Sequence, residues 1–273
     1  MPELPEVENV KNTLSQLVIG KTIDHVVVKW ENIIKLPELD EFKARLKGQT
    51  IEKIERRGKF LKLICNEDTI VSHLRMEGRY GLFSKDEPAD KHTHVIFSFT
   101  DGTELRYRDV RKFGTMHLFT KGTEDAQLPL SKLGAEPLSD EFTPVLMKEM
   151  FHKTSRSIKA VLLDQQFIAG LGNIYVDEAL HCAGIHPETP ACRLSLPRLK
   201  KLHFYIVTIL GESVEKGGST IRSYVNSVGE QGTFQLTLHV YGRTGESCRT
   251  CGKEIVRLVV AGRGTHICTS CQK

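Results

Sequence analysis

Four of the seven cysteines form two Cys-x-x-Cys pairs near the end of the chain, and this spacing constrains the local fold more than any other feature. Sixteen residues separate Cys248-x-x-Cys251 from Cys268-x-x-Cys271, a distance typical of tetrahedral zinc sites. Disulfides are the alternative, but a reducing compartment disfavours them. Four thiolates complete the coordination of the ion, so we expect one structural zinc without an open position for catalysis. Because a module of fewer than ~40 residues lacks core area, the metal would stabilise it.

The remaining composition predicts a cytoplasmic protein with more than one domain. The chain has 273 residues, of which 40% are hydrophobic, and this is enough for separate cores. Cys65, Cys182 and Cys192 lie outside the pairs and are expected to be free thiols. Charged residues interrupt the start of the chain, and no apolar stretch reaches the ~18 residues that a membrane span needs. We therefore expect no secretory signal and no membrane association, and we expect a monomer.

The hydrophobic periodicity predicts an α+β protein whose character changes near residue 130. Apolar residues recur at helical spacing from Glu6 to Leu17, which predicts an amphipathic helix that Gly20 ends. Short runs rich in β-branched and aromatic residues follow, and their regular spacing predicts a β-sandwich or barrel. The expected strands are Thr22–Lys29, Thr50–Glu55, Lys59–Cys65, Thr69–Leu74, His94–Thr100, Glu104–Arg108 and Thr115–Thr120.

A loop containing Pro129, Gly134 and Pro137 marks a domain boundary, and the pattern beyond it is helical. Helices are expected over residues 142–152, 155–165, 173–183 and 195–216, and a short strand over Thr237–Tyr241. We therefore predict three domains: an N-terminal helix with a β-sandwich over residues 1–130, a helical domain over 131–234 and a zinc module over 235–273.

The first residues, Met1-Pro2-Glu3-Leu4-Pro5-Glu6, have two interpretations. In a helix start, proline suits the first turn and acidic side chains suit the positive end of the helix dipole. If Met1 is removed, Pro2 instead carries a free secondary amine, whose pKa near ~8 leaves much of it unprotonated at neutral pH. Such an amine can attack a sugar aldehyde carbon to form an iminium, and Glu3 is placed to donate or accept the proton. Taken alone, these residues favour the ordinary helix start, and the rest of the chain has to decide between the two interpretations.

Basic residues are concentrated in the second half of the chain, although the formal net charge is only +4. Residues 152–160 and 193–201 contain bases and no acid, and residues 241–273 hold six bases against two acids. A solvated surface face is the usual reason for such runs. Three of them also fit a surface that follows a phosphate backbone.

Two glycine-flanked motifs in this half are candidates for phosphate contacts. Gly170-Leu171-Gly172-Asn173 precedes a predicted helix, whose free N–H groups and the Asn173 amide would favour an anion; a plain N-cap is the alternative. Arg263 stands between glycines at an expected hairpin tip between the cysteine pairs. It is either a phosphate contact or an incidental surface residue.

Three features of the β region are candidates for nucleic-acid contacts. Lys59 starts a predicted strand, where a solvated charge is the alternative. Met76 and Phe113 follow strand ends and are surrounded by charged residues, among them Arg111. Apolar residues in such places usually belong to the core. Exposed ones beside an arginine would suit a protein that unstacks duplex DNA and fills the gap of an extruded nucleotide.

Over its whole length the chain resembles bacterial formamidopyrimidine-DNA glycosylases. The resemblance rests on the N-terminal Pro-Glu-Leu-Pro-Glu-Val-Glu, on residues 56–60, 73–79, 109–114 and 172–175, and on the final zinc finger with Ala-Gly-Arg-Gly-Thr. It implies a bifunctional glycosylase and lyase of base excision repair. Such an enzyme removes 8-oxoguanine and ring-opened purines opposite cytosine in double-stranded DNA, and cuts the strand by β- and δ-elimination.

The resemblance also implies a role for each matching residue. Implied catalytic residues are Pro2, Glu3, Lys59 and Arg263. Implied DNA contacts are His73, Met76, Arg111, Phe113, Asn173, Arg263 and Lys153. Implied lesion contacts are Glu6, Glu77, Ser219, Thr220, Ile221, Arg222, Ser223 and Tyr224, most of them in a loop that closes over the flipped base. The helical region would be a helix-two-turn-helix motif, followed by a β-hairpin zinc finger with Cys248, Cys251, Cys268 and Cys271 as ligands.

Two other functions stay open at this level. One is an endonuclease VIII-like glycosylase that acts on oxidised pyrimidines, and the other is a zinc-stabilised protein that binds damaged DNA without cutting it. The expected location of the protein is the bacterial cytoplasm, in association with the nucleoid.

Overall fold

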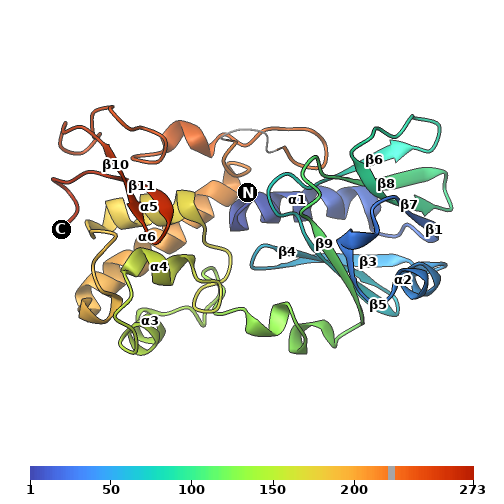
Figure 1. The fold of residues 1–273 in the computed structure, drawn as a ribbon, viewed down its shortest axis with the longest axis horizontal. Coiled ribbons are helices and arrows are strands. Elements are labelled where there is room, and N and C mark those ends of the chain that lie inside the picture. The colour runs from blue at the N-terminus through green and yellow to red at the C-terminus, as the bar shows by residue number, and fades with distance from the viewer. Residues whose placement is uncertain (221–224) are drawn as a thin grey trace. The chain divides into compact units, whose positions relative to one another are not determined.

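The computed structural model describes residues 1–220 and 225–273, and its backbone forms two compact units (Figure 1). Unit 1 combines Met1–Ser131 with Gly217–Thr233, and unit 2 combines Lys132–Lys216 with Phe234–Lys273. Unit 1 contains both large sheets, whereas unit 2 contains most of the helices and a two-stranded sheet. The predicted α+β class is therefore confirmed.

The N-terminal helix α1 (Leu4–Val18) begins two residues before the predicted start. Its apolar positions follow the helical repeat, and Val7, Val10 and Leu14 are buried on one face. Proline in the first turn and the acidic Glu6 suit a helix start.

Two sheets make up the rest of unit 1. The four-stranded sheet has the order β1 (Ile23–Val28), β7 (Thr93–Phe99), β8 (Thr103–Arg108) and β6 (Arg79–Ser84). The five-stranded sheet has the order β2 (Ile34–Leu36), β9 (Thr115–Thr120), β5 (Asp68–His73), β4 (Phe60–Cys65) and β3 (Ile51–Arg57). Neighbouring strands are antiparallel except β2 and β9. Helix α1 contacts β6 of one sheet and β3 and β4 of the other, and one hydrophobic core joins all three layers.

All seven predicted strands are present, but two strands and one helix were not predicted. Strand β2 has only three residues, and β6 contains Gly81 and lacks an alternating burial pattern. Helix α2 (Leu39–Leu46) is short and buries only Phe42 and Leu46, so its periodicity is weak. Three 3₁₀ turns complete this part of the chain: η1 (Glu31–Ile33), η2 (Glu124–Ala126) and η3 (Leu130–Lys132).

A segment from the second half of the chain returns to unit 1 and packs along α1. The Asn9 side chain donates to the carbonyl of Gly217 at 3.1 Å. Further along the helix, the amide of Ser227 donates to the Thr13 hydroxyl at 3.4 Å. Polar side chains on one edge of α1 therefore hold the described parts of residues 217–233.

Unit 2 is a helical domain with a buried core of its own. Its helices are α3 (Pro144–Phe151), α4 (Ile158–Leu163), α5 (Asn173–Ala183) and α6 (Leu196–Glu215), with 3₁₀ turns η4 (Ala191–Arg193) and η5 (Phe234–Thr237). Helix α5 packs against α6 and α4, and Gly184 ends it in the left-handed conformation at φ +72°. The four helices lie within the predicted ranges.

The strand predicted over Thr237–Tyr241 is wrong. Three successive backbone amides at His239, Val240 and Tyr241 donate to the carboxylate of Glu178, at 2.7, 2.9 and 2.8 Å. Glu178 is buried on α5, so this carboxylate replaces the partner strand that the amides would otherwise need.

The C-terminal module contains the hairpin of β10 (Val256–Val260) and β11 (Arg263–Ile267). Val260 pairs with Arg263 across a two-residue turn, and both turn residues have positive φ, +51° at Ala261 and +70° at Gly262. The β-hairpin that was predicted for the zinc finger is therefore confirmed. Among the described residues, no helix has the length and apolar character needed to cross a membrane.

Candidate functional site

The N-terminal tip of α1 brings three of the predicted site residues together. Pro2 and Glu3 are buried next to the helix start, and Glu6 lies in its first turn. The Glu3 amide donates to Oε2 of Glu6 at 2.8 Å, as one half of a capping box. Oε1 of Glu6 accepts from the Ser219 amide at 2.7 Å. The Glu6 carboxylate, only 2% exposed, therefore fixes Glu3 and joins it to the segment that begins at Gly217.

Lys59 and His73 lie at the ends of neighbouring strands. Lys59 is in the turn between β3 and β4 and is only 5% exposed, so the alternative of a solvated charge is excluded. His73 ends β5 opposite Phe60, and the two rings meet edge to face at 4.5 Å. The Arg75 amide donates to Nδ1 of His73 at 2.9 Å. Burial, with Arg75 and Lys59 nearby, lowers the pKa of His73 to about 3. At neutral pH this imidazole is uncharged and carries its proton on Nε2.

The loop between β8 and β9 is organised around the buried carboxylate of Asp109. Oδ1 accepts from the amide of Arg111 at 3.0 Å, and Oδ2 accepts from the amides of Phe113 and Gly114, both at 2.8 Å. The loop presents Phe113 half exposed, with the Arg111 guanidinium 4.6 Å from its ring centroid. Lys112 between them has φ +57°, a conformation that costs a non-glycine residue about 1–3 kcal/mol and is typical of functional loops.

A second loop, between β5 and β6, presents Met76 in the same way. Met76 is 39% exposed, and the preceding Arg75 has φ +53°. Both loops adjoin the hydroxyl of Tyr107: a Cβ atom at Gly78 would lie 2.2 Å from it, and one at Gly114 would lie 1.7 Å from it. Glycine is therefore required at both positions, and Tyr107 brings the two loops together. Met76 and Phe113 are exposed apolar residues, not members of the core.

The lesion contacts that the resemblance implied are placed only in part. Ser219 is buried on Glu6, and the Thr220 hydroxyl accepts from the Gly232 amide at 2.9 Å. Glu77 is half-buried in the Met76 loop. The remaining four, Ile221, Arg222, Ser223 and Tyr224, lie outside the described residues.

In unit 2, a buried polar network holds the zinc hairpin against the helices. The Lys159 ammonium, fully buried, lies 2.6 Å from Oδ1 of Asp177 and 3.3 Å from the carbonyl of Gly264. Oδ2 of Asp177 accepts from the amide of His266 at 2.9 Å. The Asn173 side chain donates to the same Gly264 carbonyl at 2.9 Å. Gly172, not Asn173, is the N-cap of α5, so the N-cap interpretation of Asn173 is wrong.

Lys159→Met should lower the free energy of unfolding of unit 2 by about 3–5 kcal/mol, because it leaves the Asp177 carboxylate buried without its cation. The exposed Lys153→Met serves as the control and should change stability by less than about 0.5 kcal/mol. Urea unfolding followed by circular dichroism measures both. Equal effects of the two substitutions would contradict a structural role for this ion pair.

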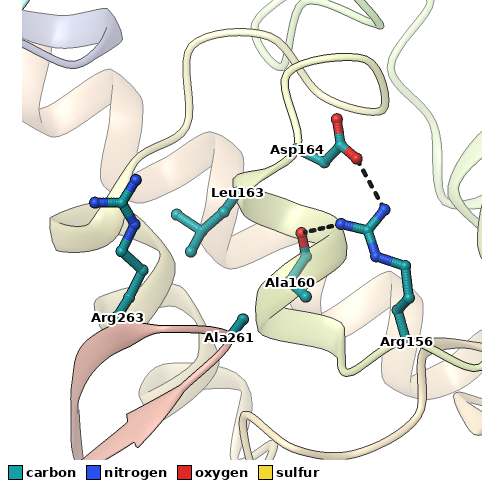
Figure 2. A pocket seen from close by; sticks show the side chains of 6 residues that line it. All are labelled: Arg156, Ala160, Leu163, Asp164, Ala261 and Arg263. Atoms are coloured by element: carbon teal, nitrogen blue, oxygen red, sulfur yellow. Dashed lines mark hydrogen bonds and ion pairs between the residues drawn. The ribbon is translucent and has the colours of Figure 1, made fainter.

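Arg263 begins β11 directly after the hairpin turn and is exposed. It lines a pocket of about 210 Å³ between the hairpin and α4, with Arg156 on the opposite side (Figure 2). Arg156 donates to Oδ2 of Asp164 at 2.8 Å and to the carbonyl of Ala160 at 3.3 Å. These bonds hold one guanidinium in place, while Arg263 is presented to solvent. Lys153 is exposed after α3.

The four paired cysteines fit a zinc ion. All four Sγ atoms lie within 4.8 Å of one another. Two of the sulfur–sulfur distances, Cys251 to Cys268 and Cys248 to Cys271, are 3.4 and 4.0 Å. Zinc–sulfur bonds of ~2.3 Å in a tetrahedron place sulfur atoms ~3.8 Å apart, between these values. The amide of Thr250 also donates to Sγ of Cys248 at 3.4 Å, as expected for a thiolate ligand.

Several residues that build these sites were not predicted. They are Asp109 and Tyr107 under the exposed loops, and Lys159, Asp177 and Glu178 under the zinc module. An Asp two residues before Arg111 is a recognisable turn signal. The others carry no local signal, because their partners are distant in the sequence.

Three family models match successive parts of the chain. Residues 1–116 match the formamidopyrimidine-DNA glycosylase N-terminal domain, residues 133–225 the H2TH domain of the same enzymes, and residues 245–273 the zinc finger found in FPG and IleRS. Formamidopyrimidine-DNA glycosylases from Bacillus licheniformis and Bacillus subtilis are 61% and 58% identical in sequence to this chain. The match covers 100% of this chain in both cases, with 100% and 99% of the relatives.

Solved structures give the same result. The Lactococcus lactis Fpg (MutM) in complex with DNA containing N7-benzyl-Fapy-dG is 42% identical, with a TM-score of 0.93 and 100% of both chains covered. The complex of L. lactis Fpg with DNA containing an abasic site is also 42% identical, with a TM-score of 0.93 and 99% of both chains covered.

Proposed function

Because the chain belongs to the formamidopyrimidine-DNA glycosylase family, and is thus a DNA glycosylase of base excision repair, we propose that it excises oxidised purines opposite cytosine and then cleaves the strand. We place this activity in the bacterial cytoplasm, at the nucleoid. The observation that carries the proposal is the buried group of Pro2, Glu3 and Glu6 at the tip of α1.

The reaction begins at Pro2 once Met1 has been removed. The secondary amine attacks C1′ of the damaged nucleotide; the N–C1′ bond forms, and the bond between C1′ and the base breaks with its electron pair going to the base, which takes up the proton that the amine gives up. Glu3 protonates the sugar ring oxygen, so that the ring opens and an iminium forms. The iminium acidifies C2′, and the Glu3 carboxylate, which has given up its proton, accepts the C2′ proton as the 3′ phosphate leaves; a second elimination expels the 5′ phosphate.

Glu6 prepares this site rather than reacting in it. Its carboxylate accepts from the amides of Glu3 and Ser219, so both oxygens are occupied by backbone donors. The backbone of Glu3, the residue that follows Pro2, is thereby fixed, and a reacting group on a backbone that is held in place accelerates a reaction strongly. The helix start and the reactive amine are therefore compatible interpretations of the same residues.

The two exposed loops of unit 1 suit a duplex from which one nucleotide has been extruded. Met76 and Phe113 would occupy the space of the extruded base, and Arg111, held over the Phe113 ring, would pair with the orphaned cytosine. Ser219, Thr220 and Glu77 are assigned to the lesion itself, together with the implied residues 221–224.

The phosphate backbone is assigned to donors in both units. In unit 1 these are Lys59 and the Nε2–H of the neutral His73, which donates without a net charge. In unit 2 they are Asn173, Lys153 and Arg263, the last also assisting catalysis through the phosphate it holds. Contacts of this kind make affinity fall with salt concentration.

A comparison of lesions tests this function. Single-turnover assays with duplexes that carry 8-oxoguanine, a formamidopyrimidine or an oxidised pyrimidine should show excision of the two purine lesions as the fastest reactions, followed by strand cleavage. Preference for the oxidised pyrimidine would favour the endonuclease VIII-like alternative. Binding without cleavage of any lesion would favour a non-catalytic binder.

Gly218→Ala should lower the single-turnover excision rate about 10–100-fold, because a Cβ there would lie 2.8 Å from Oε1 of Glu6 and displace that carboxylate. Gly20→Ala is the matched control. Both glycines have nearly the same φ, +83° and +84°, but Gly20 has no atom within 4 Å of the added Cβ. Equal losses in the two variants would show that backbone strain, not the Glu6 contact, is responsible.

A further inference from the structure

We propose that His181, Cys182 and His239 form a second metal site, for a divalent cation of the zinc class, next to the four-cysteine zinc site. One ring nitrogen of each histidine and Sγ of Cys182 lie within 4.8 Å of one another. His181 and Cys182 belong to the last turn of α5, and His239 follows η5.

The hydrogen bonding of His181 leaves one nitrogen for a metal. This residue is 4% exposed, and its Nε2 lies 3.5 Å from Sγ of Cys248. Because a zinc-bound thiolate accepts hydrogen bonds, Nε2 carries the proton and donates it to this sulfur. Nδ1 then holds a lone pair. It is buried and has no hydrogen-bond partner within the described part of the chain.

His239 provides the second nitrogen of the proposed site. Its Nδ1 is also buried without a hydrogen-bond partner among the described residues. Its backbone is fixed, since its amide donates to Glu178 at 2.7 Å. The rings of His181 and His239 are stacked with centroids 5.7 Å apart. Each unsatisfied buried polar atom is unfavourable, and one cation bound to both nitrogens would remove both deficits.

Cys182 supplies the third donor, and its partial exposure leaves access from solvent. Binding of M²⁺ replaces the thiol proton, which goes to water as the sulfur–metal bond forms. Two imidazoles and one thiolate are a donor set that zinc favours, with a fourth position left for water. The C-terminal end of α5 carries the negative end of the helix dipole, which also favours a cation.

The experiment counts zinc in the intact, zinc-loaded protein. After equilibration with micromolar free Zn²⁺, native mass spectrometry should find two ions per wild-type chain. Cys182→Ala and His239→Gln should each keep one ion and bind the second at least about 100-fold more weakly, since loss of an outer contact alone costs 10–100-fold. Cys192→Ala, which removes another partly buried thiol of unit 2, should keep two ions.

Cobalt provides a second measurement that does not need a variant. Co²⁺ added to wild type that carries a single zinc ion per chain should give the visible bands of a tetrahedral ion with one thiolate ligand, at one equivalent per chain. One zinc ion per wild-type chain, a second ion that binds only at millimolar zinc, or a second ion that persists in both variants would overturn the proposal. Absence of the cobalt bands would do the same.

Discussion

Compared with the processed chain that begins at Pro2, a chain that keeps one residue before Pro2 is expected to bind damaged duplex normally. It should excise the base at least about 10³-fold more slowly. The added residue converts the secondary amine into an amide, whose nitrogen has no available lone pair. All side chains of the site, including Glu3 and Glu6, stay unchanged. Single-turnover excision of 8-oxoguanine measures the rate, and fluorescence anisotropy with a labelled duplex measures the affinity.

Two substitutions distinguish the role of the Pro2 amine from the role of proline in the first turn of α1. Pro2→Gly should also largely abolish excision, because the secondary amine is lost. Pro5→Ala keeps the amine and removes the proline of the first turn of α1, so it should retain activity within a few-fold. If the extended chain were fully active, or if Pro5→Ala matched Pro2→Gly, Pro2 would be part of an ordinary helix start and not the nucleophile.

Cys268→Ala should remove the zinc and lower the affinity for damaged duplex at least about 100-fold. Metal binding supplies about 10–16 kcal/mol to the folding of zinc-finger peptides, far more than the ~1–3 kcal/mol that other contacts contribute. Without the ion, the hairpin that carries Arg263 loses its fold. The hydrogen bonds that Lys159 and Asn173 donate to the carbonyl of Gly264 do not replace the metal. Elemental analysis and anisotropy at fixed salt concentration measure the two losses.

Cys192→Ala is the control for this prediction, because Cys192 lies in the same unit outside the paired cysteines. Cys192→Ala should keep the zinc ion and an unchanged affinity for damaged duplex. Loss of zinc from Cys268→Ala with unchanged affinity would contradict the assignment of the zinc hairpin to DNA binding.

Arg263→Ala should make the slope of log affinity against log salt concentration shallower by about one, as expected for the loss of one phosphate contact.

Much of the fold was predictable because its signals are local. The zinc spacing, the periodicity of α1 and the β-branched runs each lie within one short segment, and all of them correspond to observed elements. The strand predicted over Thr237–Tyr241 failed for the opposite reason. Its amides donate to Glu178, some sixty residues earlier in the chain, and no local pattern records this partner.

The same distinction applies to the site. Pro2, Arg111 and the cysteines belong to recognisable motifs, so the sequence located them. The carboxylate of Glu6 reaches Ser219, and the burial of Lys59 and the neutrality of His73 depend on strand pairing. These properties follow from tertiary structure alone. They determine whether the residues can hold a nucleotide or move a proton.

Borohydride reduction during turnover tests the assignment of Pro2 most directly. Reduction traps the iminium as a stable amine, and digestion followed by mass spectrometry identifies the residue that carries the sugar. With 8-oxoguanine duplex and protein whose intact mass shows loss of Met1, the adduct is expected on the N-terminal peptide, at the nitrogen of Pro2. An adduct on a lysine such as Lys59, or no adduct, would contradict the proposed nucleophile.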